Sequence, residues 1–321
     1  MKAVVYDRFG PPAVLQITEI ETPAPKPGEV LVKIHASSIN YGDRMLVSGK
    51  PFLIRLMGYG LLSPKHRVLG GDIAGTVEAV GEAVTGFKSG DEVYADVGNA
   101  GFGGYAEYVS VPEDVLTRRP SNIAFEEAAA VPQAAAVALQ GLRDKGEIKS
   151  GEKVLINGAS GAIGTFAVQI AKDYDAEVTG VCSTKNMELV RSIGADHVID
   201  YKKEDFTKSD TRYDLILDIV ANRSTSDYIN TLNSNGRYVA VAFNVSTLFL
   251  GSMYSKNGRK AVSLSHEPRV DDLVYLRELI EAGKVKPVVD RVFPLTEIAE
   301  AMRYHESGAP NGKVVITMEA E

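Results

Sequence analysis

The sequence predicts an α/β protein with two domains, a compact, partly closed β domain and a doubly wound parallel sheet, from three observations. The chain of 321 residues is too long for one ordinary hydrophobic core. Residues 1–122 contain short alternating or β-branched runs that end at turn formers, such as "EVLVKIHAS" from Glu29 and "GTVEAVG" from Gly75. From about Gly151 strand-like and helix-like runs alternate, which predicts a parallel sheet with both faces covered.

The alternating region begins with the strand "KVLIN" at Lys153 and a helix that ends at Lys172. The runs that follow are "EVTGVC", a helix from Asn186, "HVID", "YDLILDIV", a helix over residues 223–233 and "RYVAVAF". The closing strand "KVVITME" could return to the β-rich first stretch, since that stretch is already a sheet. We therefore expect one domain from residues 1–122 and 290–321, with residues 123–289 inserted as the other.

Composition excludes several classes of protein. The net charge is −7, the pI is near 5.4, and basic residues are scattered, which argues against a nucleic-acid surface. The run "AAAVPQAAAVALQGL" from Ala128 is interrupted and weakly apolar, so we interpret it as a buried helix. The single cysteine, Cys182, excludes an intrachain disulfide framework, and the N-terminal residues show no signal peptide, so a cytoplasmic protein is expected.

A glycine motif provides the first candidate site. Gly158, Gly161 and Gly164 follow the strand "KVLIN" and open the next helix, in the stretch that also holds Ser160, Ala162 and Ile163. Such glycines allow a tight turn, backbone approach to a pyrophosphate at the helix N-terminus, and close packing of helix on strand. Any tight strand-to-helix turn can use glycines, but the βαβ pattern on both sides favours a dinucleotide site.

The end of the second strand indicates which dinucleotide. NAD enzymes usually place an acid there to bind the ribose 2′-hydroxyl. Here the strand runs into Ser183, Thr184 and Lys185, which offer two hydroxyls and a cation to a 2′-phosphate. We therefore predict NADPH as the cofactor. Ser183 and Thr184 could instead cap the helix that starts near Asn186, and both roles are compatible.

Several motifs together resemble the medium-chain dehydrogenase/reductase superfamily, within it the zinc-independent quinone oxidoreductase (ζ-crystallin-like) branch. The resemblance covers essentially the whole chain. Its motifs are "GGDIAGTVEAVG" from Gly70, "GDEVYA" from Gly90, "GGYAEYVSVP" from Gly103, the Ala-rich run, "GEKVLINGASGAIGTFAVQIAK" from Gly151, "IGADHVIDY" from Ile193 and "GKVVIT" from Gly312. Ala162 departs from the branch, which usually has glycine there; its methyl group is tolerable if the backbone is helical.

The resemblance implies a GroES-like β-rich catalytic domain, a Rossmann domain, an active site in the cleft between them and a homodimer. It implies that Asn40 and Asp43 are catalytic residues, with Asn40 orienting a carbonyl or the nicotinamide amide. Both could instead only cap the following turn. Some relatives place a proton-donating tyrosine where this chain has Met45; Tyr41 could substitute, or could simply pack.

The resemblance also implies further cofactor residues. Tyr201 matches a tyrosine near the adenosine, Asn222 and Phe243 follow the fourth and fifth strands, and Lys313 matches a lysine that can reach the cofactor. A solvated Lys313 is the alternative.

Zinc can be tested against the residues themselves. The positions of the family's zinc ligands read "SSINYGD" and Gly70, Gly71, Asp72, without cysteine or histidine, and the five histidines show no ligand spacing. We expect no metal. Without a Lewis acid an alcohol is a poor substrate, whereas hydride transfer to a quinone or an enone gives a delocalised anion. We therefore expect a small apolar quinone or enone substrate.

Three other functions compete with quinone reduction. A short-chain dehydrogenase needs Tyr-x-x-x-Lys, which none of the 14 tyrosines satisfies. An NADPH-binding regulatory or structural protein with little turnover stays open, as does an enone or 2-alkenal double-bond reductase. Two apolar stretches, residues 45–66 and 243–258, could cover a substrate, form a dimer interface or touch a membrane, with membrane contact considered unlikely.

Overall fold

The computed structural model describes residues 1–241 and 258–318, which form two compact units. Unit 1 comprises Met1–Gln133, Pro268–Glu281 and Pro287–Glu321, and unit 2 comprises Ala134–Glu267 and Ala282–Lys286. These limits differ from the predicted domain limits of 122 and 290 chiefly at the helix α8 (Val270–Glu281). α8 lies in unit 1, where the Tyr94 hydroxyl donates to the carbonyl oxygen of Leu273 at 2.6 Å.

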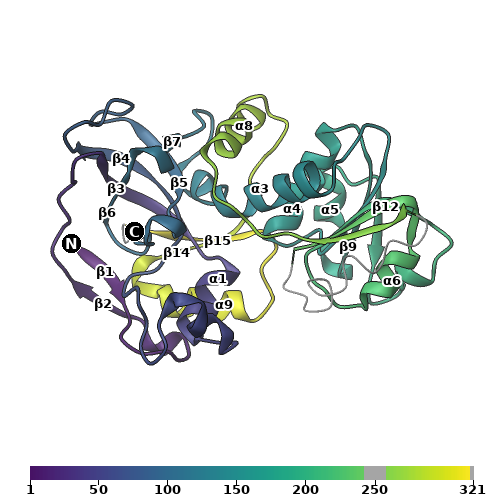
Figure 1. Cartoon of the computed structure of the whole chain (residues 1–321), viewed down its shortest axis with the longest axis horizontal. Helices are drawn as coiled ribbons and strands as arrows, with labels where there is room; N and C mark the ends of the chain where they lie inside the picture. The colour runs from purple at the N-terminus through teal and green to yellow at the C-terminus, as the bar shows by residue number, and fades with distance from the viewer. Residues whose placement is uncertain (242–257, 319–321) are drawn as a thin grey trace. The chain divides into compact units, whose positions relative to one another are not determined.

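Unit 1 is built on a seven-stranded sheet in the order β14-β15-β3-β4-β5-β7, with β6 paired to β3 (Figure 1). Its strands are β3 (Glu29–Ser38), β4 (Asp72–Val80), β5 (Glu92–Asp96), β6 (Tyr108–Pro112), β7 (Thr117–Arg118), β14 (Val289–Pro294) and β15 (Lys313–Thr317), and a separate pair is formed by β1 (Lys2–Val5) and β2 (Gln16–Glu19). The C-terminal strand β15 pairs antiparallel with β3, so the return of the chain end to the first domain is confirmed.

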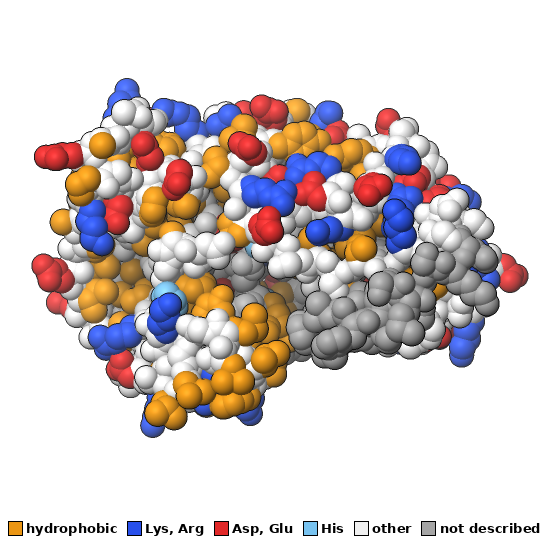
Figure 2. Space-filling model, in the orientation of Figure 1, with side chains coloured by type: hydrophobic (Ala, Val, Ile, Leu, Met, Phe, Trp, Pro, Cys, Tyr) orange, Lys and Arg blue, Asp and Glu red, His pale blue; other side chains and the backbone are white. Residues whose placement is uncertain are grey.

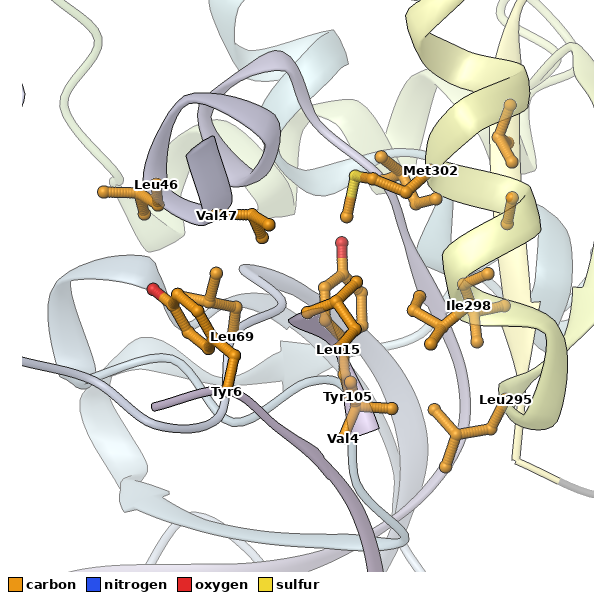
Figure 3. Close-up of a cluster of buried hydrophobic side chains, with 14 of the residues drawn as sticks. Val4, Tyr6, Leu15, Leu46, Val47, Leu69, Tyr105, Leu295, Ile298 and Met302 are labelled. Carbon is orange, nitrogen blue, oxygen red and sulfur yellow. The ribbon is translucent and has the colours of Figure 1, made fainter. Parts of the chain in front are cut away.

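The helices of unit 1 are short apart from α8. They are α1 (Tyr41–Ser48), α2 (Phe125–Ala129) and α9 (Ile298–Glu306), with a π-helical turn η2 (Arg55–Tyr59) and 3-10 turns at Pro12–Val14, Gly98–Ala100, Glu113–Val115 and Leu295–Glu297. Side chains from both ends of the chain share one core, because α1 and α9 bury their apolar faces with the β1 region (Figure 3). That core includes Tyr6, Leu46, Tyr105, Ile298 and Met302.

Unit 2 contains a six-stranded parallel sheet in the order β10-β9-β8-β11-β12-β13. In chain order this is 3-2-1-4-5-6, the order of a doubly wound dinucleotide-binding sheet. The strands are β8 (Lys153–Asn157), β9 (Glu177–Cys182), β10 (His197–Asp200), β11 (Tyr213–Asp218), β12 (Leu232–Ala240) and β13 (Lys260–Ser263). This parallel order confirms the predicted α/β class with a Rossmann sheet, and β8 and β9 also have the predicted bounds.

The helices of unit 2 follow these strands. They are α4 (Ala162–Asp173), α5 (Met187–Ser192) and α6 (Thr225–Asn230), with 3-10 turns at Thr184–Asn186 and Phe206–Lys208. The prediction that the Ala-rich run forms one buried helix is wrong, because the helix is interrupted. α2 ends at Ala129, α3 (Pro132–Leu139) begins at the proline, and a π-helical turn (Gln140–Lys145) follows. Pro132 lacks a backbone N–H and can begin a helix but cannot continue one. The run is buried as predicted.

Candidate functional site

The candidate cofactor site lies at the carboxyl ends of β8 and β11, the adjacent strands between which the strand order of the unit 2 sheet reverses. Asn157 ends β8, and its amide nitrogen lies 2.8 Å from Asp218 Oδ1, 3.1 Å from Asn222 Oδ1 and 3.0 Å from the Tyr228 hydroxyl. Tyr238 donates to the other Asp218 oxygen at 2.8 Å. This network fixes the exposed Asn222 at the sheet edge where ligands of such sheets bind, and its cofactor role stays a prediction.

The three glycines of the loop after β8 differ in their local surroundings. Gly158 has φ +93°, a conformation that side chains rarely adopt, so it permits the turn after β8. A Cβ at Gly164 would lie 2.1 Å from the Gly158 carbonyl oxygen, so α4 packs against the loop only because that position is glycine. A Cβ at Gly161 would meet nothing closer than 3.5 Å. Neither a positive φ nor a crowded neighbour requires glycine at 161, the middle glycine of the three, although glycine is a common residue at a helix N-cap. The predicted approach of a ligand to this backbone stays a prediction.

The start of α4 has the geometry of a phosphate site. Gly161 is the N-cap with φ −82° and ψ 177°, and the helix begins at Ala162, so the expected helical backbone at that departure from the family motif is confirmed. The first N–H groups of a helix lack intrahelical partners and carry the positive end of its dipole. Ser160 Oγ accepts a hydrogen bond from Asn186 at 2.9 Å, which connects the loop to the end of the second strand. Ile163 is half-buried beside it.

The end of β9 differs from the sequence prediction in one respect. Ser183 is buried, whereas Thr184 and Lys185 are exposed. No acid directly follows β9 in the sequence, but Asp200, at the end of the neighbouring β10, accepts the Thr184 hydroxyl at 2.5 Å. This bond, the largest cause, together with nearby lysines, lowers the pKa of Asp200. A carboxylate therefore lies beside the predicted 2′-phosphate position. The Thr184 hydroxyl donates its hydrogen bond to this carboxylate and not to a phosphate.

Two further lysines offset this charge. Lys202 and Lys203 are exposed and follow β10, and Lys203 Nζ lies 3.9 Å from Asp200. The backbone of Tyr201 donates to the Cys182 carbonyl at 3.1 Å, which holds these residues beside the end of β9, and the Tyr201 ring is 47% exposed. Sequence reasoning missed both lysines. The signal was available, because parallel neighbouring strands bring their carboxyl ends together.

A second polar cluster lies in unit 1 around Asp72, a residue 0% exposed. Its Oδ2 accepts from Ser38 at 2.7 Å, from the Asn40 amide at 2.9 Å and from Lys313 Nζ at 3.1 Å. Lys313 also donates to Asn40 Oδ1 at 2.6 Å. Both ends of the Asn40 amide are thus fixed, which assigns its oxygen and nitrogen. Lys313 is 1% exposed, so the alternative of a solvated lysine is wrong.

Asp43 lies in the same region but has different partners. Its Oδ2 accepts the backbone N–H of Asn40 at 2.8 Å and the Tyr105 hydroxyl at 3.0 Å. Burial raises the pKa of Asp43 to about 7, and burial together with Asp43 raises the pKa of Tyr105 well above its usual value. Asp43 therefore caps the start of α1, as the alternative interpretation expected, and shares a buried proton network with a tyrosine that the sequence analysis did not select.

The two other residues considered near this site lie apart from that network. Tyr41 is 65% exposed, with the Arg44 guanidinium 5.4 Å from its ring centre, so packing in the core is not its role. Met45 packs against the hydrophobic cluster of Figure 3. Phe243, with most of the second apolar stretch, lies outside the described residues.

The residues of unit 1 do not fit a metal ion. Within residues 1–241 and 258–318, no three His, Cys, Asp or Glu side chains lie together in a way that could hold one. The acid at the family's ligand position, Asp72, is already paired with the ammonium group of Lys313. A lysine cation in contact with this carboxylate disfavours a divalent cation there, and the surrounding donors, Ser38 and Asn40, are already engaged.

Together the fold and these sites define a dinucleotide-binding protein with a second, β-rich unit. Residues 26–121 match the family model "Alcohol dehydrogenase GroES-like domain", and residues 193–316 match "Zinc-binding dehydrogenase". The chain is 32% identical over 330 residues to the chloroplast envelope quinone oxidoreductase homolog of Arabidopsis thaliana, covering 98% of each. It is 36% identical to the chloroplastic NADPH-dependent alkenal/one oxidoreductase of the same plant, covering 98% of this chain and 79% of that protein.

A solved structure gives the same result. The quinone oxidoreductase from Coxiella burnetii superimposes with a TM-score of 0.89 at 30% identity, and the match covers 99% of each chain. The chain belongs to the medium-chain dehydrogenase/reductase superfamily, in the zinc-independent quinone oxidoreductase-like branch. It is an oxidoreductase that uses a nicotinamide cofactor. No helix among the described residues is long and apolar enough to cross a bilayer.

Proposed function

We propose that the protein is an NADPH-dependent reductase of conjugated carbonyl compounds, quinones or enones, that works without zinc. The observation that carries the proposal is the ion pair between Lys313 and Asp72. Asp72 stands where zinc-dependent members of the family have a metal ligand, and its carboxylate is bound to an ammonium group. Without a Lewis acid, an acceptor that delocalises the developing charge is the better substrate. The names of the two Arabidopsis relatives, a quinone and an alkenal/one oxidoreductase, support this class of acceptor.

In this proposal unit 2 binds the cofactor through the backbone of Gly161, Ala162 and Ile163. The pyrophosphate is neutralised by the N–H groups and dipole of α4, and Lys185, Lys202 and Lys203 hold the 2′-phosphate. The bound nicotinamide supplies a hydride. Asn222 and Tyr201 line the same sheet edge in the proposal, and Phe243 remains a predicted contact.

Asn40 has the role of orienting a carbonyl, either of the acceptor or of the nicotinamide amide. A side-chain amide has two N–H donors, and Asp72 takes one of those of Asn40. Lys313 pins the amide oxygen, so the remaining N–H has a fixed direction, which is what positioning an acceptor requires. Asp43 supports Asn40 through its backbone N–H. Water is the proton source in this scheme, with Tyr41 as the side-chain alternative. A cytoplasmic homodimer stays a prediction.

The proposal is tested with NADPH that carries deuterium at the transferable position of the nicotinamide. With a small quinone and with a short enone, the expected result is slower oxidation of the labelled cofactor, and in the enone product deuterium at the β-carbon. Oxidation without label transfer to the enone product, or the absence of any isotope effect with either acceptor, contradicts the proposal.

A further inference from the structure

A cluster of exposed apolar side chains occurs in unit 1 between Phe52 and Leu62. Leu62 is 91% exposed and Met57 67%, far more than core residues of a soluble protein. Figure 2 shows hydrophobic side chains gathered at the lower edge of the molecule in that view. The cluster, called here the apolar patch, consists of Phe52, Leu53, Leu56, Met57, Leu61 and Leu62. Single exposed apolar residues are ordinary, but a contiguous patch marks an interaction surface.

The segment that carries the patch is strongly basic. No Asp or Glu occurs from Arg44 to Gly71, although the whole chain has a net charge of −7. Its basic residues are Arg44, Lys50, Arg55, Lys65 and Arg67. Among the described residues, the ion pairs that the structure gives this segment are Arg44 with Glu306 at 3.8 Å and Arg67 with Asp7 at 2.7 Å. The segment that carries the apolar patch therefore has a net positive charge on a protein whose overall charge is negative, and Lys50, Arg55 and Lys65 have no ion pair among those given for the described residues.

We propose that the apolar patch docks on the surface of an anionic phospholipid bilayer. Basic side chains are attracted to anionic headgroups, while Leu, Phe and Met side chains enter the boundary between headgroups and acyl chains. The Arg55 guanidinium lies 4.3 Å from the Phe9 ring centre and 5.7 Å from that of Phe52, so cation and apolar ring already lie side by side. Charge and exposure together favour contact with a bilayer, the role that the sequence favoured least for residues 45–66.

Two other occupants fit these observations less well. Small ligands bind in concave sites that bury most of their surface, whereas the patch side chains project into solvent. A second copy of the chain that met the patch symmetrically would place one basic segment against another, which electrostatics disfavour. The bilayer proposal goes beyond the proposed enzymatic function and does not depend on it.

The test measures cosedimentation of the full chain with two kinds of vesicle, phosphatidylcholine alone and phosphatidylcholine mixed with phosphatidylglycerol. The expected result is binding to the anionic vesicles that weakens with salt. Lys50→Glu and Lys65→Glu each lower the partition coefficient by about fivefold or more. Leu56→Ser with Leu62→Ser lowers it by about tenfold or more, since two apolar side chains no longer leave water.

Matched controls use exposed residues of unit 1 elsewhere. Lys26→Glu and Ile17→Ser, at side chains 79% and 39% exposed, leave the partition coefficient unchanged. Equal binding to both vesicles, or no binding to either, overturns the proposal. The proposal is also overturned if the double variant Leu56→Ser with Leu62→Ser binds vesicles like wild type. Dissociation of a dimer by that variant would then assign the patch to a second copy, and a raised KM for an apolar acceptor would assign it to the substrate.

Discussion

The three glycines after β8 allow stability to be separated from cofactor binding. Gly164→Ala would place a methyl group 2.1 Å from a backbone oxygen of the loop and 2.8 Å from Ala159 Cα. Backbone atoms cannot rotate away, so α4 must shift, and overpacking of this kind costs about 1–3 kcal/mol in the free energy of unfolding. Gly161→Ala meets no such obstacle, because its φ and ψ are extended and the nearest atom is 3.5 Å away.

Gly161→Ala therefore leaves the unfolding free energy within about 1 kcal/mol of wild type, and can raise it by restricting the unfolded chain. Its effect falls on the cofactor instead. If the methyl group keeps the pyrophosphate from one N–H group at the start of α4, a charge-assisted hydrogen bond of about 1.5–3 kcal/mol is lost. We expect NADPH affinity to fall by about tenfold or more.

The assay combines denaturant unfolding of the cofactor-free protein with fluorescence titration by NADPH. The reasoning is refuted if Gly161→Ala binds NADPH like wild type, or if it loses as much stability as Gly164→Ala. Unchanged NADPH binding would mean that no ligand approaches the middle glycine, and an equal loss of stability would mean that this glycine serves the fold.

Three further predictions concern the charged residues. Burial raises the pKa of Asp43 from 3.8 to about 7, so the contribution of this group to stability is full below about pH 4 and is lost as the pH rises through about 7. Denaturant unfolding across this range should show the unfolding free energy of wild type falling by up to about 4 kcal/mol relative to that of Asp43→Asn. No pH dependence of that difference contradicts the burial argument. Charge reversal at Lys202 and Lys203 should lower kcat/KM with NADPH by about tenfold or more and spare NADH; equal loss with both cofactors rejects a 2′-phosphate site. Lys313→Met leaves a buried carboxylate unpaired and should cost about 3–5 kcal/mol in chemical unfolding, partly restored by adding Asp72→Asn; an unrestored double variant contradicts the pairing.

Local patterns made much of the Rossmann unit predictable. Strands buried on both faces read as apolar runs, and a glycine turn between strand and helix has few alternatives, so β8, the loop and α4 were located from sequence. The break at Pro132 was visible in the residues but was not used to end a helix there.

The unit 1 cluster could not be predicted in the same way. Lys313 and Asp72 are 241 residues apart in sequence and meet because β15 and β4 both pair with β3. Nothing in the sequence around Lys313 distinguishes it from a solvated lysine. Tyr105 lies in the alternating run "GGYAEYVSVP", whose pattern indicates only a strand. Asp200 was missed for a different reason: like Lys202 and Lys203 it lies at the end of β10, a strand that the sequence predicted, but only the end of β9 was considered for the 2′-phosphate.

The central claim is zinc-free reduction of a conjugated acceptor by NADPH. The most direct measurement follows NADPH and NADH oxidation by protein stripped of metal and kept with a chelator, with a small quinone and a short enone in separate reactions. The account predicts turnover with NADPH on at least one acceptor, undiminished by the chelator and weaker with NADH. NADPH binding without turnover on either acceptor would favour a binding protein, and activity that returned only with added zinc would contradict the assignment of Lys313 and Asp72.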